Sequence, residues 1–176
     1  MDLAIIPECY VDTNLIETLV PPVKGGYNHQ KGCGRVAAVM KAEFADNFAL
    51  GIIDKDKNQL DYLKEFALAH QYGNLLLYKH DQKPHYIIQI SPAIERFLMS
   101  GADSVGISLT DYDLPADLHR LKKISKSVNS KQDPRFKQLI RSVSKAGAPE
   151  FLKLSQWIKY IRDTNYDISL DELKAL

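Results

Sequence analysis

The segment "FALGIIDKDK", residues 48–57, carries the clearest structural signal in the chain. Its first six residues are apolar or glycine, the composition of a short strand that is buried on both faces of a parallel sheet. Asp54 and Asp56 follow, with one residue between them. Because sheets of this kind bind ligands beyond the carboxyl ends of their strands, the sequence predicts a strand over 48–54 that brings acids to that edge.

Strand and helix patterns alternate on both sides of this segment. An apolar run at 3–6, which can extend to Val11, predicts a strand, and the helical spacing from Thr13 to Val20 predicts a helix that ends at Pro21. The other elements expected in this part of the chain are helices over 36–44, 58–71 and from Ser91 onward, and strands over 74–78 and 86–90. Such alternation is typical of α/β folds. We therefore expect a mainly parallel sheet flanked by helices, formed by residues 1–103.

Residues 104–176 contain no further strand pattern, and we expect them to form a basic, α-helical C-terminal region packed on the α/β domain. The helical segments predicted there are 114–128, 133–143, 148–163 and 169–176. In the third of them Phe151, Leu154, Ile158 and Ile161 have the spacing of a core-facing stripe.

The net charge of +1 hides an uneven distribution along the chain. Residues 118–162 contain 12 Lys and Arg against 2 Asp and Glu, and the rest of the chain contains 11 and 20. Lys and Arg side chains bind nucleic-acid phosphates and release the condensed counterions. The basic block is therefore a candidate nucleic-acid surface. Neutralisation by the acidic part of the chain, or docking of a protein partner, would explain the charge equally well.

Several classes of protein are disfavoured. The chain has no apolar run of about 18 residues and no secretory leader pattern at its N-terminus, so we expect a soluble, cytoplasmic protein that does not bind a membrane. Cys9 and Cys33 are the only cysteines, and their spacing suits neither a disulfide framework nor a structural zinc site.

The acids near the predicted strand ends suggest a metal-binding or catalytic site. Glu8 follows the first apolar run, and Asp54 and Asp56 follow the buried strand. Two aspartates in this arrangement can bind one Mg²⁺ (or Mn²⁺) ion through hard oxygen ligands. A nearby glutamate could act as a general acid or base, or complete the metal site.

The combination of "AIIPECYVDTNLIETL" and "FALGIIDKDK" resembles the TOPRIM domain of topoisomerases, DnaG-type primases and the overcoming-lysogenisation-defect nucleases. That resemblance covers about residues 3 to 100 and implies a metal-dependent nuclease, with Glu8 as catalytic acid–base and Asp54 and Asp56 as Mg²⁺ ligands. The segment "PAIERFL" is similar to that of TOPRIM-like proteins of phage defence, which implies Glu95 as an additional metal-binding acid. Where the family usually has glycine after the glutamate, this chain has Cys9.

A rival resemblance takes Asp12 as the acid that ends the first strand. "CYVDTNLIETL" is similar to the opening of PIN-domain ribonucleases, which implies Asp12 as the catalytic metal ligand, Asn14 as an auxiliary group, and Glu43 or Asp103 as later members. In a third interpretation Asp12 only caps the helix. A fourth possibility is a non-catalytic nucleic-acid or protein interaction module that keeps a degenerate TOPRIM-like fold.

Basic residues near the acids are the candidate substrate contacts. The loop "GGYNHQKGCGR", residues 25–35, is rich in glycine, and its Lys31 and Arg35 could contact phosphate. Lys55 lies between the two aspartates, and Lys122 and Lys123 belong to the basic block. We expect these five side chains to contribute to binding of a nucleic acid.

Overall fold

The computed structural model describes residues 2–55 and 61–176 of the chain. The strands are β1 (Ile5–Pro7), β2 (Ala49–Asp54), β3 (Phe66–Tyr72), β4 (Leu75–His80) and β5 (His85–Ile90). The α-helices are α1 (Tyr10–Leu19), α2 (Cys33–Val39), α3 (Ile94–Ser104), α4 (Leu118–Ser125), α5 (Pro134–Lys145), α6 (Pro149–Thr164) and α7 (Leu170–Ala175). Short helical turns are η1 (Asp2–Ala4), η2 (Met40–Phe44), η3 (Asp61–Glu65), η4 (Leu109–Tyr112), η5 (Val128–Lys131) and η6 (Asn165–Asp167).

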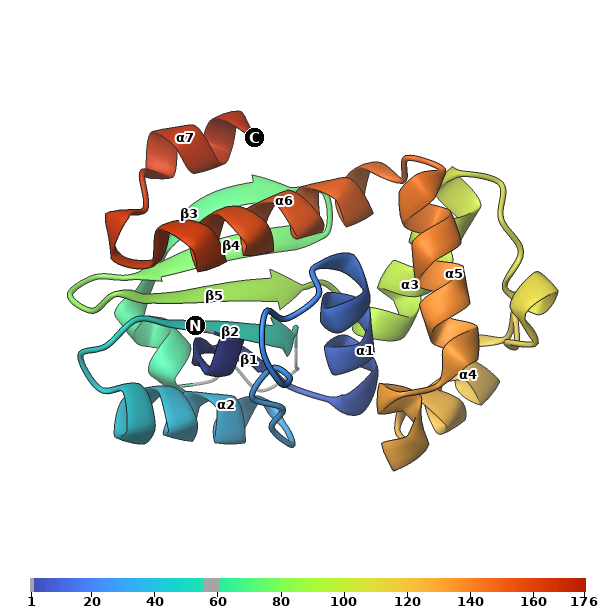
Figure 1. Ribbon diagram of the computed structural model, residues 1–176, viewed down its shortest axis with the longest axis horizontal. Coiled ribbons are helices and arrows are strands. Elements are labelled where there is room, and N and C mark those ends of the chain that lie inside the picture. Colours follow the sequence, from blue (N-terminus) through green and yellow to red (C-terminus); the bar gives the residue numbers. More distant parts are fainter. Residues whose placement is uncertain (1, 56–60) are drawn as a thin grey trace.

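The five strands form one mixed sheet in the order β1-β2-β5-β4-β3, with helices on both faces (Figure 1). The β1–β2 and β2–β5 pairs are parallel, whereas β5–β4 and β4–β3 are antiparallel. The α/β class is therefore confirmed. The expectation of a mainly parallel sheet is wrong, because the three consecutive strands β3, β4 and β5 pair antiparallel.

The error comes from the segment 58–71, for which helical spacing predicted a helix. Its described part forms the turn η3 and then the edge strand β3. Tyr72 pairs with Leu75, so a two-residue loop, Gly73–Asn74, joins β3 to β4. Gly73 adopts a φ of 53°, which glycine tolerates and which the tight turns of β-hairpins require. Pairing with β4 outweighs the local helix preference.

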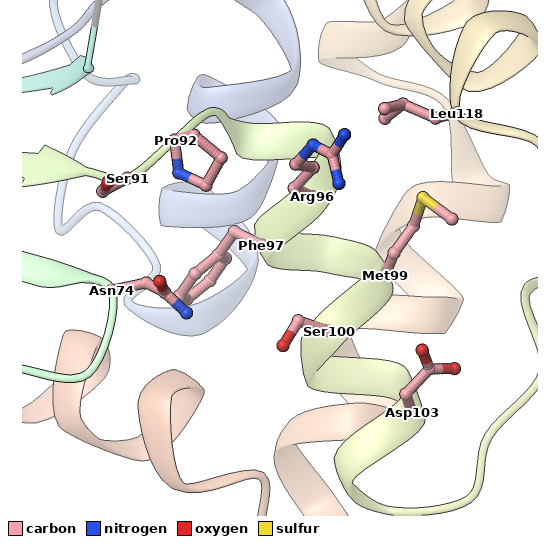
Figure 2. A pocket seen from close by; sticks show the side chains of 9 residues that line it. All are labelled: Asn74, Ser91, Pro92, Arg96, Phe97, Met99, Ser100, Asp103 and Leu118. Atoms are coloured by element: carbon pink, nitrogen blue, oxygen red, sulfur yellow. The ribbon is translucent and has the colours of Figure 1, made fainter.

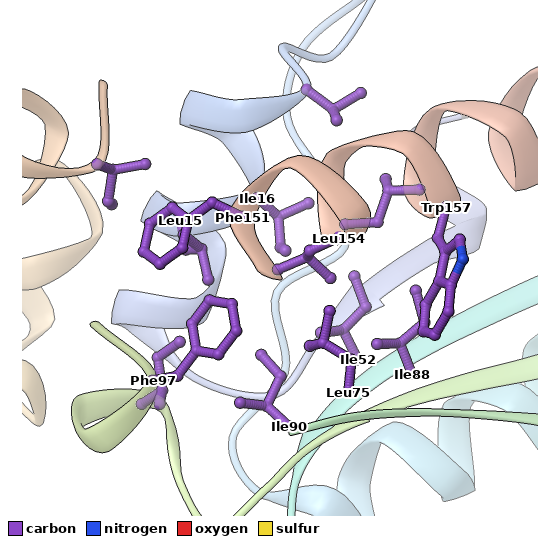
Figure 3. Close-up of a cluster of buried hydrophobic side chains, with 14 of the residues drawn as sticks. Leu15, Ile16, Ile52, Leu75, Ile88, Ile90, Phe97, Phe151, Leu154 and Trp157 are labelled. Atoms are coloured by element: carbon purple, nitrogen blue, oxygen red, sulfur yellow. The ribbon is translucent and has the colours of Figure 1, made fainter. Parts of the chain in front are cut away.

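The predicted C-terminal helices are confirmed as α4 to α7. They join the sheet in one hydrophobic core rather than forming a core of their own. Phe151, Leu154, Ile158 and Ile161, the predicted stripe of α6, are all fully buried. Trp157 is fully buried as well, and it lies beside Ile88 of the sheet in Figure 3. The boundary between two domains at residue 103 stays a prediction.

A close contact joins α6 to α3. The rings of Phe97 and Phe151 stack with a centroid separation of 4.9 Å and an angle of 8° between their planes (Figure 3). The ring of Phe151 also occupies the space that a Cβ atom would fill at Gly101. Only glycine at position 101 lets the two helices approach in this way.

The outer edge of β1 is covered by the glycine-rich loop. The backbone N–H groups of Asn28 and Gln30 donate hydrogen bonds to the carbonyls of Ile5 and Pro7, each at 3.0 Å. The Gly32 N–H then donates to the carbonyl of Glu8 at 3.2 Å. The segment 28–32 thus runs along β1 like an additional strand, and its alternate residues are held in fixed positions.

A histidine cluster, formed by the buried Tyr62, His80 and His85 and the exposed Glu65, lies at the end of the sheet where β5 begins. Tyr62 Oη and His85 Nδ1 are 2.6 Å apart, and His85 Nε2 lies 3.0 Å from the Asn47 carbonyl. His80 Nε2 lies 3.2 Å from Glu65 Oε2, and two backbone N–H groups of the following turn donate to its Nδ1. All four ring nitrogens of the two histidines therefore have a hydrogen-bond partner.

Within the described part of the chain, no helix is both long and apolar enough to span a lipid bilayer.

Candidate active site

Glu8 is the acid that follows the first strand. β1 ends at Pro7, and the backbone N–H of Glu8 continues the sheet by donating to the carbonyl of Ile52 at 3.0 Å. The Glu8 side chain then turns toward the neighbouring strand, where its Oε2 accepts a hydrogen bond from the backbone N–H of Asp54 at 2.9 Å. Since β1 and β2 are parallel neighbours, two acids 46 residues apart meet at one edge of the sheet.

Asp12 lies in the first turn of α1 and does not end a strand, which differs from the position that the rival alignment expects. Cys9, with an extended backbone at φ −134° and ψ 175°, is the N-cap. Its Sγ accepts from the Asp12 N–H at 3.5 Å, and Asp12 Oδ2 accepts from the Cys9 N–H at 3.0 Å. Asp12 is therefore not the N-cap residue itself but the N3 partner in a capping box, in which its carboxylate accepts the Cys9 N–H. Any residue can adopt the extended backbone conformation of Cys9, so this position does not require glycine.

The later acids of the rival alignment lie elsewhere. Glu43 is exposed on η2. Asp103 lines a separate cavity of about 370 Å³ beside α3 (Figure 2). Arg96 and Ser100 line that cavity from the same helix. The structure therefore brings neither Glu43 nor Asp103 to Asp12.

Glu95 is held in the first turn of α3, close to Asp54. Asp54 Oδ1 accepts a hydrogen bond from the backbone N–H of Ile94 at 2.9 Å, which ties the start of α3 to the end of β2. Glu95 is buried, and its Oε1 accepts from the Ser125 hydroxyl at 2.5 Å. We refer to Glu8, Asp12, Asp54 and Glu95 together as the acidic cluster.

Burial and the charges of neighbouring acids raise the pKa values of two members of the acidic cluster, Asp54 and Asp12. Burial raises the pKa of Asp54 to about 9, and the negative charges of the other three acids add to the shift. Burial likewise raises the pKa of Asp12 to about 7. Asp12 Oδ1 is in addition a buried oxygen with no hydrogen-bond partner. Strongly perturbed acids that lie together in this way are typical of functional sites.

A cavity of about 280 Å³ opens at the acidic cluster. Helices α1, α3, α4 and α5 gather beyond the carboxyl end of β5 in Figure 1, which places this cavity at the edge where ligands were expected. Its lining residues are Glu8, Cys9, Tyr10, His29, Lys31, Gly32, Asp54, Ile94, Glu95, Ser125 and Lys126.

The predicted basic contacts are only partly at this cavity. Lys31 lines it, and Lys55 is exposed beside Asp54. Arg35, Lys122 and Lys123 are not among its lining residues. Lys126, about one turn beyond Lys122, supplies the positive charge from the basic block instead.

Ser125, Lys126 and Tyr10 line the cavity but were not predicted as site residues, and His29 was noted only as a charged member of the glycine-rich loop. Tyr10 and Lys126 carry no local pattern that points to a site. Ser125 is separated from its partner Glu95 by 30 residues. The only sequence signal for His29 is its place beside Lys31 in the glycine-rich loop.

The donor chemistry of the acidic cluster suits a hard divalent cation. Carboxylate oxygens are the ligands that Mg²⁺ and Mn²⁺ prefer, and a cation would relieve the repulsion between the acids. Within residues 2–55 and 61–176, no group of three or more His, Cys, Asp or Glu side chains is arranged as a complete metal site. Asp56, the second aspartate of the expected pair, lies outside the described residues.

Comparisons of the chain with protein-family models, curated proteins and solved structures found no match. Function is therefore inferred from the geometry of the site.

Proposed function

We propose that the protein is a TOPRIM-like, metal-dependent nuclease that hydrolyses phosphodiester bonds at the acidic cluster. The observation that best supports this is the pairing of Glu8 with Asp54 at the ends of neighbouring parallel strands, beside a cavity that both acids line. The resemblance of the two segments around these acids to the TOPRIM pattern points to the same pair. A role in phage defence, which that resemblance also implies, remains part of the proposal.

The acids and lysines around the cavity each have a role in this proposal. Asp54 and Glu95, with Asp56, hold Mg²⁺ or Mn²⁺, and Glu8 serves as the acid–base residue. When bound, the cation would stabilise negative charge on the phosphate and lower the pKa of water. Lys31 and Lys126 approach the cavity from the glycine-rich loop and from the end of α4. Their positive charges would hold the phosphates that flank the scissile bond.

A cleavage screen tests the proposal. End-labelled single- and double-stranded DNA and RNA are incubated with the protein in Mg²⁺ or Mn²⁺, in parallel with Glu8→Gln and Asp54→Asn. We expect metal-dependent cleavage of at least one substrate and a loss of at least about 100-fold in each variant, the usual contribution of an acid–base or metal-binding group. Glu43→Gln, which changes an exposed acid, is the matched control and should cleave normally.

Two outcomes would contradict the proposal. If Asp12→Asn abolished cleavage while Glu8→Gln did not, the chemistry would belong to the PIN-type alternative. If calorimetry detected no binding of Mg²⁺ or Mn²⁺ by the folded protein and no substrate were cleaved, the protein would be a non-catalytic interaction module.

A further inference from the structure

His29 is fixed at the wall of the cavity by the loop that covers β1. The N–H groups of its neighbours Asn28 and Gln30 donate to carbonyls of β1. The intervening residue His29, and Lys31 two positions later, both line the cavity. The imidazole stacks on the ring of Tyr10 with a centroid separation of 4.4 Å and an angle of 24°. Two independent contacts, one of backbone and one of side chain, thus hold the ring in place.

The hydrogen bonds of Thr13 determine which nitrogen of His29 carries a proton. The Thr13 hydroxyl donates its one hydrogen to the carbonyl of Cys9 at 2.8 Å. Thr13 Oγ1 lies 3.0 Å from His29 Nδ1. Since a hydroxyl has one hydrogen and two lone pairs, Nδ1–H must be the donor in the second contact. In a neutral imidazole the lone pair is then on Nε2.

The surroundings of His29 favour this neutral form. Burial lowers the pKa of the ring, and the positive charges of Lys131 and Lys31 lower it further, while the Cys9 carbonyl acts in the opposite direction. His29 Nε2 is buried and has no hydrogen-bond partner in the described structure. A buried acceptor without a partner costs free energy, and His29 belongs to the cavity wall, so a hydrogen-bond donor that reached Nε2 from the cavity would relieve that cost.

We propose that His29 is the proton acceptor of the site, with Nε2 taking a proton from the water molecule that attacks the phosphorus. This inference rests on the proposed nuclease function and assigns the base half of its acid–base chemistry. The water oxygen forms a bond to phosphorus, and one of its protons moves to Nε2. The bond from phosphorus to the leaving ester oxygen breaks, and that oxygen takes a proton from the Glu8 carboxyl. His29 then releases its proton to solvent, and Glu8 takes one up.

The other groups at the cavity suit this task less well. Lysine ammonium groups have no lone pair. Burial and the nearby Asp12 raise the pKa of the Cys9 thiol, so that it stays protonated. Glu95 accepts the Ser125 hydroxyl hydrogen, and Asp54 accepts from the Ile94 N–H.

The tautomer is tested by NMR without any assay of activity. Long-range ¹H–¹⁵N spectra of the ¹⁵N-histidine-labelled protein at pH 7 should show His29 with a protonated Nδ1 and a bare Nε2, assigned by loss of its signals in His29→Asn. A ring protonated on Nε2, or on both nitrogens, would overturn the inference.

The catalytic role is tested by two variants in the cleavage assay. His29→Asn keeps an N–H group close to the position of Nδ1, and so the contact with Thr13, but removes Nε2. We expect it to lower kcat by about 100-fold with little change in KM. His29→Ala should lose as much, and added imidazole should restore part of its kcat, which a purely structural role would not produce. His119→Gln, at an exposed histidine of α4, is the control.

The outcomes separate this inference from the proposed function. Cleavage by the wild type together with unchanged kcat in both His29 variants would overturn the role of His29 alone. A wild type that cleaves no substrate in either metal would overturn the nuclease function and, with it, the base role.

Discussion

The histidine cluster and the acidic cluster lie at opposite ends of β2 and β5 and differ in how their polar atoms are satisfied. His85 pairs with Ala49 at one end of these strands, and Asp54 pairs with Ile90 at the other. In the histidine cluster every ring nitrogen has a partner. In the acidic cluster four acids lie close enough to repel one another when ionised, and Asp12 Oδ1 has no hydrogen-bond partner.

This difference separates a polar cluster that supports the fold from one that suits a ligand. Buried polar groups that satisfy one another rigidify a core. Like charges held together reduce stability, and natural proteins keep such arrangements mainly where function needs them. The four predictions below test whether the two clusters behave in these opposite ways.

The largest expected effect is at the histidine cluster. His85→Phe keeps most of the ring volume but leaves the Tyr62 hydroxyl and the Asn47 carbonyl without partners. We expect the free energy of unfolding to fall by about 3 kcal/mol, because each buried unpaired group costs about 1–3 kcal/mol. Urea unfolding followed by circular dichroism measures this change in the free energy of unfolding. Tyr78→Phe, which loses only a 3.5 Å contact with Gln89, is the control, and an equal loss in both variants would contradict the prediction.

The opposite sign is expected at the acidic cluster. Asp54→Asn replaces a carboxyl that must take up a proton on folding, because its folded pKa is about 9, with a neutral amide, and it keeps the Oδ1 that accepts from the Ile94 N–H. At pH 8 the variant should be more stable than the wild type by about 0.5–2 kcal/mol, a common gain when a strained functional group is replaced. The same urea experiment measures this gain, with Glu43→Gln as the exposed control. A destabilised Asp54→Asn protein would show that the cluster is structural.

The two clusters should also give opposite pH dependences. Unfolded aspartates titrate near about pH 4, whereas in the folded protein the pKa of Asp54 is about 9 and that of Asp12 about 7. Between these values the folded state binds more protons, so the free energy of unfolding falls as the pH rises. Burial lowers the pKa of His85 to about 4, below the value of about 6.5 for an unfolded histidine. The contribution of His85 to the free energy of unfolding therefore falls as the pH drops from about 6.5 to about 4.

Unfolding curves at half-unit steps from pH 4 to pH 9 measure these contributions. The fall above pH 6.5 should shrink in Asp54→Asn, and the fall between pH 4 and 6.5 should become steeper in His85→Phe, which lacks the opposing contribution of the histidine. Unchanged pH profiles in both variants would mean that neither cluster controls stability.

The smallest effect is expected at the link between the acidic cluster and α4. Ser125→Ala removes the 2.5 Å hydrogen bond to Glu95, which should cost about 0.5–1.5 kcal/mol. Ser100→Ala, at an exposed position of α3, should cost nothing measurable in the same experiment. If the two variants were equally stable, Ser125 would not support the acidic cluster.

The acids at strand ends could be predicted from the sequence because each follows a short apolar run. Once two neighbouring parallel strands are predicted, Glu8 and Asp54 are expected to lie together at the ends of those strands. The hairpin at β3 and β4 could not be recognised from helical periodicity, although "YGNL", residues 72–75, contains the Gly-Asn pair of a tight loop. The helical spacing of 58–71 and the turn residues of 72–75 predict different structures, and the chain forms the hairpin that the turn residues favour.

Neither the cap of α1 nor the cavity wall formed by Ser125 and Lys126 could be predicted from the sequence. A cysteine is an uncommon N-cap, so the capping box of Cys9 and Asp12 had no recognisable pattern. Ser125 and Lys126 reach the acidic cluster because α4 packs near α3. That arrangement depends on tertiary packing, which no local pattern in the basic block encodes.

The contact between Gly101 and Phe151 limits how this chain can be divided. A truncation that removed the basic helices would also withdraw the ring of Phe151 from α3. It would leave an unfilled hollow against the helix whose first turn carries Glu95. Loss of function in such a fragment would therefore not show that the positive charge of the basic helices is needed for function. The basic surface is better probed in the intact chain, by reversing single exposed lysines such as Lys123.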